Sequence, residues 1–211
     1  MALIATNSGG GSFKEAPEGT HIARCFSIID LGTQHGDYQG TPTVKHEAIV
    51  RWELPHEVVT IDGEDKPMVV SKFYTVSTNE KSNLRRDWES WAGRKLTHDE
   101  LLHGVDLTKL LGRACQLSIQ HNAQGKARVT AVTGLAKGMQ CPPQVNANQT
   151  YAVEQGRDEA FQALPTGFQS IIERCEEWQG VKRTKPQASV RDVNGALQMA
   201  AQLDEDESLP F

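Results

Sequence analysis

The chain has 211 residues, of which 38% are hydrophobic and 23% charged, and its formal net charge at pH 7 is -5. This length suits one folded core with appended segments. Because there is no long apolar run and the first four residues are too few for a signal peptide, we expect no membrane span and a cytoplasmic protein.

The four cysteines are scattered along the chain, and no two of them form a C-x-x-C pair. Such spacing favours neither a zinc site nor a disulfide framework, and reduced thiols are expected. No histidine pair with a neighbouring acid has the spacing of a metal site. We therefore expect no metal, no cofactor and no catalytic residues.

Residues 1–12 are rich in glycine and serine, which is typical of a flexible arm. No Lys-Ser or Lys-Thr pair follows the glycines, so they do not form a phosphate-binding P-loop. The apolar run Thr20–Leu31 predicts a first strand. The turn-rich residues 32–40 predict a long loop after it.

Alternation in Val44–Leu54 predicts a second strand, with Trp52 in the core and Arg51 on the opposite face. Pro55 is expected to limit this strand. A third strand is predicted at Met68–Val76, where Lys72 and Tyr74 share one face and Phe73 lies on the other. Because a charged neighbour indicates exposure, we expect Lys72 and Tyr74 to face a groove, with Phe73 as the alternative.

After the third predicted strand, the spacing of apolar residues changes from that of strands to that of helices. Leu84, Trp88 and Trp91 recur at helical spacing within Asn79–Trp91, where Thr78 or Asn79 would be the cap. Thr97–Glu100 has the pattern of a capping box for a second short helix. A further turn or two is expected between Asp106 and Gly112.

Two more strands are predicted at Arg113–His121 and Lys126–Thr133, joined by a hairpin turn. The order of three strands, a helical insert and two strands is the plan of a five-stranded OB-fold-like barrel. The expected fold class is therefore mainly β. A different small barrel or an α+β sandwich would have the same strand count.

Residues 13–180 are expected to form the folded domain, with 135–180 as a C-terminal extension that contains a short helix around Phe168–Trp178. This extension would either pack on the barrel or mediate self-association, so a homo-oligomer stays an open alternative. Residues 181–211 have too few apolar side chains for a core, and we expect a disordered linker and tip.

The last eight residues place four acids directly before a short apolar end. The partner-binding candidates are Asp204, Glu205, Asp206, Glu207, Leu209, Pro210 and Phe211. A partner pocket with basic residues could bind the acids and the terminal carboxylate, while an apolar slot binds Leu209 and Phe211. A solvated acidic tail that merely aids solubility is the plainer alternative.

This ending resembles the acidic tip of bacterial and phage single-stranded-DNA-binding proteins, which closes on Pro-Phe. The resemblance covers only these eight residues, and Ser208 interrupts the acidic run. It implies that the tip recruits replication, recombination and repair proteins of the host or phage. It also implies that an OB-fold elsewhere in the chain binds the DNA.

Subtracting the four acids of the tip leaves 22 cations and 23 acids in residues 1–203, a net of -1. Residues 107–153 carry five cations and no acid. Single-strand binding needs cations for phosphates and aromatic faces for bases. The candidate DNA-binding residues are Lys72, Tyr74, Arg51, Phe73, Arg113, Lys126, Arg128, Lys137 and Tyr38.

Together these features predict a non-catalytic single-stranded-DNA-binding protein, of phage or plasmid origin. Three alternatives remain at this point: a recombination mediator or strand-annealing protein, a metal-dependent DNA-processing enzyme, and an interaction protein that binds no DNA. The acids show no recognisable spacing for a metal-dependent nuclease, and Gly63–Lys66 resembles a turn.

Overall fold

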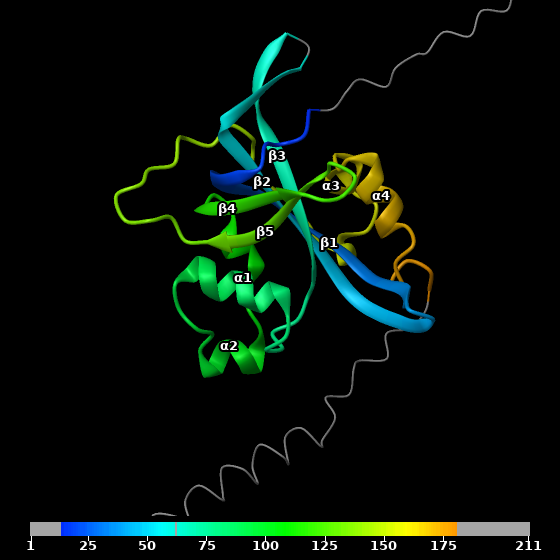
Figure 1. Cartoon of the computed structure of the whole chain (residues 1–211). Helices are drawn as coiled ribbons and strands as arrows, with labels where there is room; N and C mark the ends of the chain where they lie inside the picture. The colour runs from blue at the N-terminus through cyan, green and yellow to red at the C-terminus, as the bar shows by residue number, and fades with distance from the viewer. Residues whose placement is uncertain (1–13, 62, 181–211) are drawn as a thin grey trace, which may run out of the picture.

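The computed structural model describes residues 14–61 and 63–180. They form a mainly β structure around a six-stranded sheet in which five strands follow the order β3-β2-β1-β4-β5 (Figure 1). Their bounds are Gly19–Tyr38 for β1, Thr41–Ile61 for β2, Glu64–Thr75 for β3, Ala114–His121 for β4 and Ala127–Thr133 for β5. These strands pair antiparallel, whereas the short β6 (Gln149–Tyr151) pairs parallel to β1.

The prediction of a long loop at residues 32–40 is wrong, because β1 continues through this segment and forms an extended hairpin with β2. The hairpin closes on Gln39 and Gly40, which both have positive φ, as a tight two-residue turn requires. The prediction that Pro55 limits the second strand is also wrong. Pro55 lies within a register shift between Leu54 and Val58, where a strand tolerates proline, and β2 continues beyond it.

The predicted helical insert between the third and fourth strands is confirmed. It contains α1 (Asn83–Ala92), α2 (His98–His103) and the 3-10 turn η1 (Leu107–Leu110). Ser82, rather than Thr78 or Asn79, caps α1, because its hydroxyl accepts the backbone N–H of Leu84 at 3.2 Å. The capping box of Thr97 and Glu100 is confirmed at the start of α2.

The main core lies between the inner faces of the strands and α1. Trp52 is 1% exposed and packs against Trp91 of α1, with 6.2 Å between the ring centroids. The indole N–H of Trp91 also donates to the carbonyl of Ala114 at 2.9 Å, which joins α1 to the start of β4. Both tryptophans therefore belong to the core, which confirms the prediction for Trp52.

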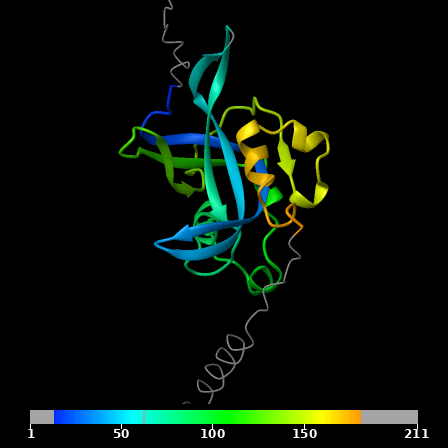
Figure 2. The ribbon, with the colours of Figure 1, turned by 90° about the vertical axis from the view of Figure 1, so that its right-hand side faces the viewer.

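A second core forms where the C-terminal extension packs on the outer faces of β1 and β2. The extension contains β6, η2 (Val153–Gln155), α3 (Glu159–Gln162) and α4 (Thr166–Ile172), which Figures 1 and 2 show together on one side of the sheet. Ile29 and Ile49 of the sheet pack there against apolar side chains of the extension. Packing of the extension on the sheet is thus confirmed, although α4 ends at Ile172 and does not reach Trp178.

Gly32 shows how closely the extension approaches β1. Its φ of 72° lies in the left-handed region, and a Cβ at this position would lie 2.8 Å from the Cβ of Cys175. Any side chain here would therefore both strain the backbone and push the extension away.

The strands β3 and β5 end the five-strand order on either side and come close to each other, without a ladder between them in the described residues. The tip of the β2–β3 hairpin projects from the body in both views (Figures 1 and 2). Among the helices described, none has the length and apolar character needed to cross a membrane.

Candidate nucleic-acid interface

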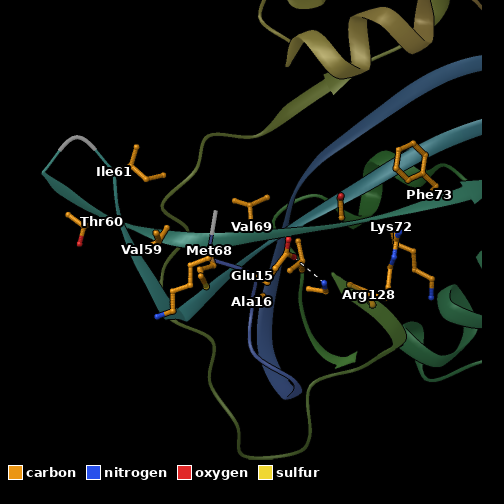
Figure 3. A pocket seen from close by; sticks show the side chains of 15 residues that line it. Glu15, Ala16, Val59, Thr60, Ile61, Met68, Val69, Lys72, Phe73 and Arg128 are labelled. Carbon is orange, nitrogen blue, oxygen red and sulfur yellow. Dashed lines mark hydrogen bonds between the residues drawn. The ribbon is translucent and has the colours of Figure 1, made fainter. Parts of the chain in front are cut away.

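A groove with a volume of about 710 Å³ lies between β3 and β5, and we call it the β3–β5 groove (Figure 3). One wall comes from the β2–β3 hairpin, and the other comes from β5 and the segment that precedes β1. The lining residues are Lys14, Glu15, Ala16, Val59, Thr60, Ile61, Met68, Val69, Val70, Ser71, Lys72, Phe73, Ala127, Arg128 and Val129.

The outer face of β3 supplies apolar surface to this groove. Val69 and Phe73 lie two positions from Ser71 on either side, so all three point to the same face, and all are exposed. Phe73 is 45% exposed on β3, the strand at one end of the five-strand order. Its ring is therefore available to stack on a base.

The expectation that Lys72 and Tyr74 form the solvent-facing side of this strand is wrong. Tyr74 is only 4% exposed, and its hydroxyl donates to Asp87 of α1 at 2.9 Å. Burial, together with the charge of Asp87, raises the pKa of Tyr74 far above its ordinary value. The Lys72 ammonium donates to the same carboxylate oxygen at 2.6 Å.

Asp87 explains why the assignment of faces failed. A lysine two residues from Tyr74 indicates a solvent-exposed strand face only if no buried carboxylate can pair with the lysine. Here the helical insert brings the buried carboxylate of Asp87 to β3. The lysine stem passes the Tyr74 ring, with the ammonium 5.4 Å from the ring centroid. Lys72 still lines the end of the groove, but its ammonium is already paired with Asp87.

Arg128 is the best placed cation of the groove. It is exposed on β5 and has no ion pair within the described part of the chain. Lys14 is also exposed at the groove, whereas Lys126 lies beside it and pairs with Glu15 at 2.9 Å. That bond and the backbone N–H of Ala127 hold the pKa of Glu15 below its ordinary value.

The lining therefore carries three cations, Lys14, Lys72 and Arg128, against one acid, Glu15. A groove whose lining combines an excess of positive charge with an exposed aromatic ring suits a ligand that combines phosphates with flat bases. Figure 3 shows Phe73 and Lys72 at one end of the groove and the hairpin residues Thr60 and Ile61 at the other.

A second, smaller groove of about 310 Å³ continues from Phe73 toward the start of α1. Phe73, Tyr74 and Thr75 belong to its lining, together with polar side chains and one cation from the segment after β3. Those further residues are Ser77, Asn79, Lys81, Ser82 and Asn83, and Glu47 of β2 adds an acid to the lining. Phe73 lines both grooves, and we call the two grooves together the path along β3.

Arg51, a predicted phosphate contact, lies outside this path. Its guanidinium is 5.0 Å from the ring centroid of Phe26 and 5.5 Å from that of Phe168, and it donates to Gln149 at 3.4 Å. Burial lowers the pKa of Arg51 from its ordinary value. This side chain joins β2 to the extension, so its surroundings favour a structural role.

The other predicted residues do not gather at the groove. Tyr38 is 65% exposed at the tip of the β1–β2 hairpin, Arg113 directly precedes β4, and Lys137 follows β5. All three are exposed, but none lines the β3–β5 groove. The tip residues 204–211 and the arm residues 1–12 lie outside the described residues.

Sequence reasoning missed Val69, Ile61 and Lys14 as groove residues. The alternation of β3 could have identified Val69, because it shares a face with Phe73. No local sequence pattern identifies Lys14 or Ile61 as groove residues. They line one groove only because the β2–β3 hairpin folds close to the segment before β1. Within the residues described, no cluster of three or more histidine, cysteine or acidic side chains could hold a metal ion.

Comparison with protein-family models and with curated proteins finds no match for this chain.

Proposed function

We propose that this protein binds single-stranded DNA without catalysis, through an OB-fold-like barrel, and recruits replication, recombination and repair proteins through its acidic C-terminal tip. The single observation that carries the proposal is the β3–β5 groove, whose lining contains the exposed Phe73 together with Lys72 and Arg128. An exposed ring can stack on any base, and the cations can neutralise phosphates.

The sheet order supports the barrel part of the proposal. In an OB-fold the strands β1, β2 and β3 form a meander, β4 pairs with β1, and β5 pairs with β4. The order β3-β2-β1-β4-β5 has the same connections, and the helical insert falls between β3 and β4. OB-folds bind oligonucleotides on their second and third strands, where Phe73 and Val69 are exposed in this protein.

The groove favours a single strand over a duplex for a geometric reason. Stacking on Phe73 requires an unpaired base whose face is open, and the bases of a duplex are stacked on one another. Stacking on a ring does not distinguish one base from another, so we expect little sequence preference. The protein would coat a strand, and the tether to the tip would raise the local concentration of a recruited enzyme.

The test is a titration of fluorescently labelled oligo-dT and of a labelled duplex of equal length, followed by anisotropy. We expect tighter binding to oligo-dT, weakening about 20-fold when salt rises from about 50 mM to about 200 mM, as for about three phosphate contacts. Labelled oligo-U in the same assay would compare RNA with DNA. Equal affinity for oligo-dT and duplex would contradict the proposal.

A chain that ends at residue 203 tests the recruiting role separately. Its affinity for oligo-dT should stay equal or increase, because the four acids of the tip repel phosphates. Its binding to purified host replication and repair proteins should be lost. Retained binding of those proteins would exclude the tip as the recruiting element.

A further inference from the structure

The β3–β5 groove exposes several large apolar side chains. Ile61, Val69 and Phe73 are each at least 40% exposed around the same groove. Both walls are also edge strands, since β3 and β5 end the five-strand order. An exposed apolar groove between open strand edges marks either an interaction site or an aggregation hazard, so a covering segment would protect the free protein.

The chain itself enters the molecule at this groove. The carboxylate of Glu15 accepts the backbone N–H of Ala127 at 3.0 Å and the ammonium of Lys126 at 2.9 Å, which fixes the segment against β5. The carbonyl of Ala16 is 2.8 Å from Nε2 of His121. Lys14 then lines the groove, so the segment before it is attached to the described residues at this groove.

The composition of residues 1–13 suits this groove. Residues 1–5 read Met-Ala-Leu-Ile-Ala, residues 6–12 are small or polar, and no side chain in the segment is charged. Nine residues separate Ile4 from Lys14, and a glycine-rich chain of that length spans roughly 15–18 Å on average. The strand from Val69 to Phe73 covers about 13 Å, so the apolar residues can reach the whole of it.

We propose that residues 1–5 occupy the β3–β5 groove of the free protein, with Leu3 and Ile4 packed on Val69 and Phe73, and that a bound strand displaces them. An extended segment would also meet the open edge of β3, as in strand addition. Displacement by DNA rests on the proposed function, whereas occupation of the groove by the segment does not.

Occupation of the groove can be measured without DNA. Val69→Cys places a thiol on the groove wall, in a Cys141→Ser background because Cys141 is the one native cysteine that is not buried. The rate of reaction with a maleimide is compared between this chain and the same chain carrying Leu3→Asp and Ile4→Asp. Since a tethered segment acts at roughly millimolar effective concentration, we expect about threefold to tenfold faster labelling in the double variant.

Val44→Cys is the matched control, because Val44 is exposed on β2 and lies outside the groove. Its labelling rate should not change with the substitutions at residues 3 and 4. Equal rates for Val69→Cys in both chains would overturn the inference. Protection that disappears on dilution would also overturn it, because that result assigns the groove to a second copy of the chain.

The oligo-dT affinity of the same variants separates the two proposals. If the segment covers the groove, the Leu3→Asp, Ile4→Asp variant should bind oligo-dT about threefold to tenfold more tightly than the unmodified chain. Faster labelling with no oligo-dT binding by either chain would support the covered groove and contradict the DNA-binding function. Tight oligo-dT binding with an unchanged labelling rate at Val69→Cys would support the DNA-binding function and contradict the covered groove.

Discussion

The two outer surfaces beside β2 use similar residues for opposite purposes. On the side of the extension, Arg51 lies between two aromatic rings, and Glu53 is fully buried with its carboxylate hydrogen-bonded to the extension. On the side of β3, Phe73 and Arg128 are exposed at an open groove. Arginine and aromatic side chains thus hold the fold together on one side and remain available to a ligand on the other.

The difference arises from what covers each surface. Residues 141–178, more than a hundred positions after β1, cover the outer faces of β1 and β2 and satisfy their polar groups. The described part of that extension does not reach the β3–β5 groove. A charged or aromatic residue on an outer strand face is therefore a binding candidate only where no later segment is packed on it.

The largest effect is expected from breaking the covered side. Glu53 accepts the backbone N–H groups of Val145 and Asn146 at 2.9 and 2.8 Å, and the side-chain amide of Asn146 at 2.7 Å. Glu53→Gln replaces one of these acceptors with a donor, leaving buried N–H groups without a partner. We expect a loss of about 3 kcal/mol of unfolding free energy, measured by urea denaturation.

Glu64→Gln is the control for this change, because Glu64 lies exposed near the tip of the β2–β3 hairpin. Its unfolding free energy should stay within about 0.5 kcal/mol of that of the unmodified chain. Similar stability for the two variants would show that the anchor at Glu53 is unimportant to the fold.

Phe73→Ala tests the open side. The loss of one stacking platform should weaken oligo-dT binding by about 2 kcal/mol, roughly 30-fold, with little change in stability because the ring is half exposed. Tyr38→Ala is the matched control, since Tyr38 is an exposed aromatic outside the groove. A larger loss for Tyr38→Ala would move the interface to the β1–β2 hairpin.

A pair of arginine variants compares the two sides directly. Arg128→Met should weaken oligo-dT binding about fivefold and reduce the salt slope by roughly 0.7, with unchanged unfolding free energy. Arg51→Met should instead lower the unfolding free energy by about 1 kcal/mol through lost ring contacts and leave binding unchanged. Binding that depends on Arg51 and not on Arg128 would reverse the assignment of the two surfaces.

The order of the strands and the helical insert could be predicted because each is encoded locally. Alternation marks Val44–Leu54, and the capping box at Thr97 marks the start of α2. The extent of the β1–β2 hairpin could not be predicted in the same way. Residues 32–38 contain turn-forming types, and they become a strand only because β2 and the extension pair and pack with them.

The interface could be predicted only in part. Phe73, Lys72 and Arg128 were all candidates from the sequence and all line one groove. The inward direction of Lys72 depends on Asp87, which lies 15 positions away on a helix. The covering of Arg51 depends on Phe168, which is further still. The alternation of residues along a strand carries no information on either partner. It therefore could not show which outer surface stays exposed and which is covered by the extension.

The smallest predicted effect is on the pH dependence of stability, through carboxyl groups at the contact between β1 and the extension. Asp30 accepts from Nε2 of His46 at 2.7 Å and from the backbone N–H of Gly32 at 2.9 Å. Burial alone would raise the pKa of Asp30, but these bonds hold it below its ordinary value. Glu177 accepts from the backbone N–H and hydroxyl of Thr33 at 2.8 Å, and its pKa is likewise lowered despite its burial.

A carboxyl group whose pKa is lower in the folded state stabilises the fold above its unfolded pKa, which is about 4 for both residue types. That stabilisation is lost as the pH falls through the folded pKa. Asp30→Asn should therefore be less stable than the unmodified chain at pH 6, and the difference should shrink toward pH 3. Urea midpoints at several pH values measure it, and parallel curves would show that Asp30 contributes no pH-dependent support to the covered side.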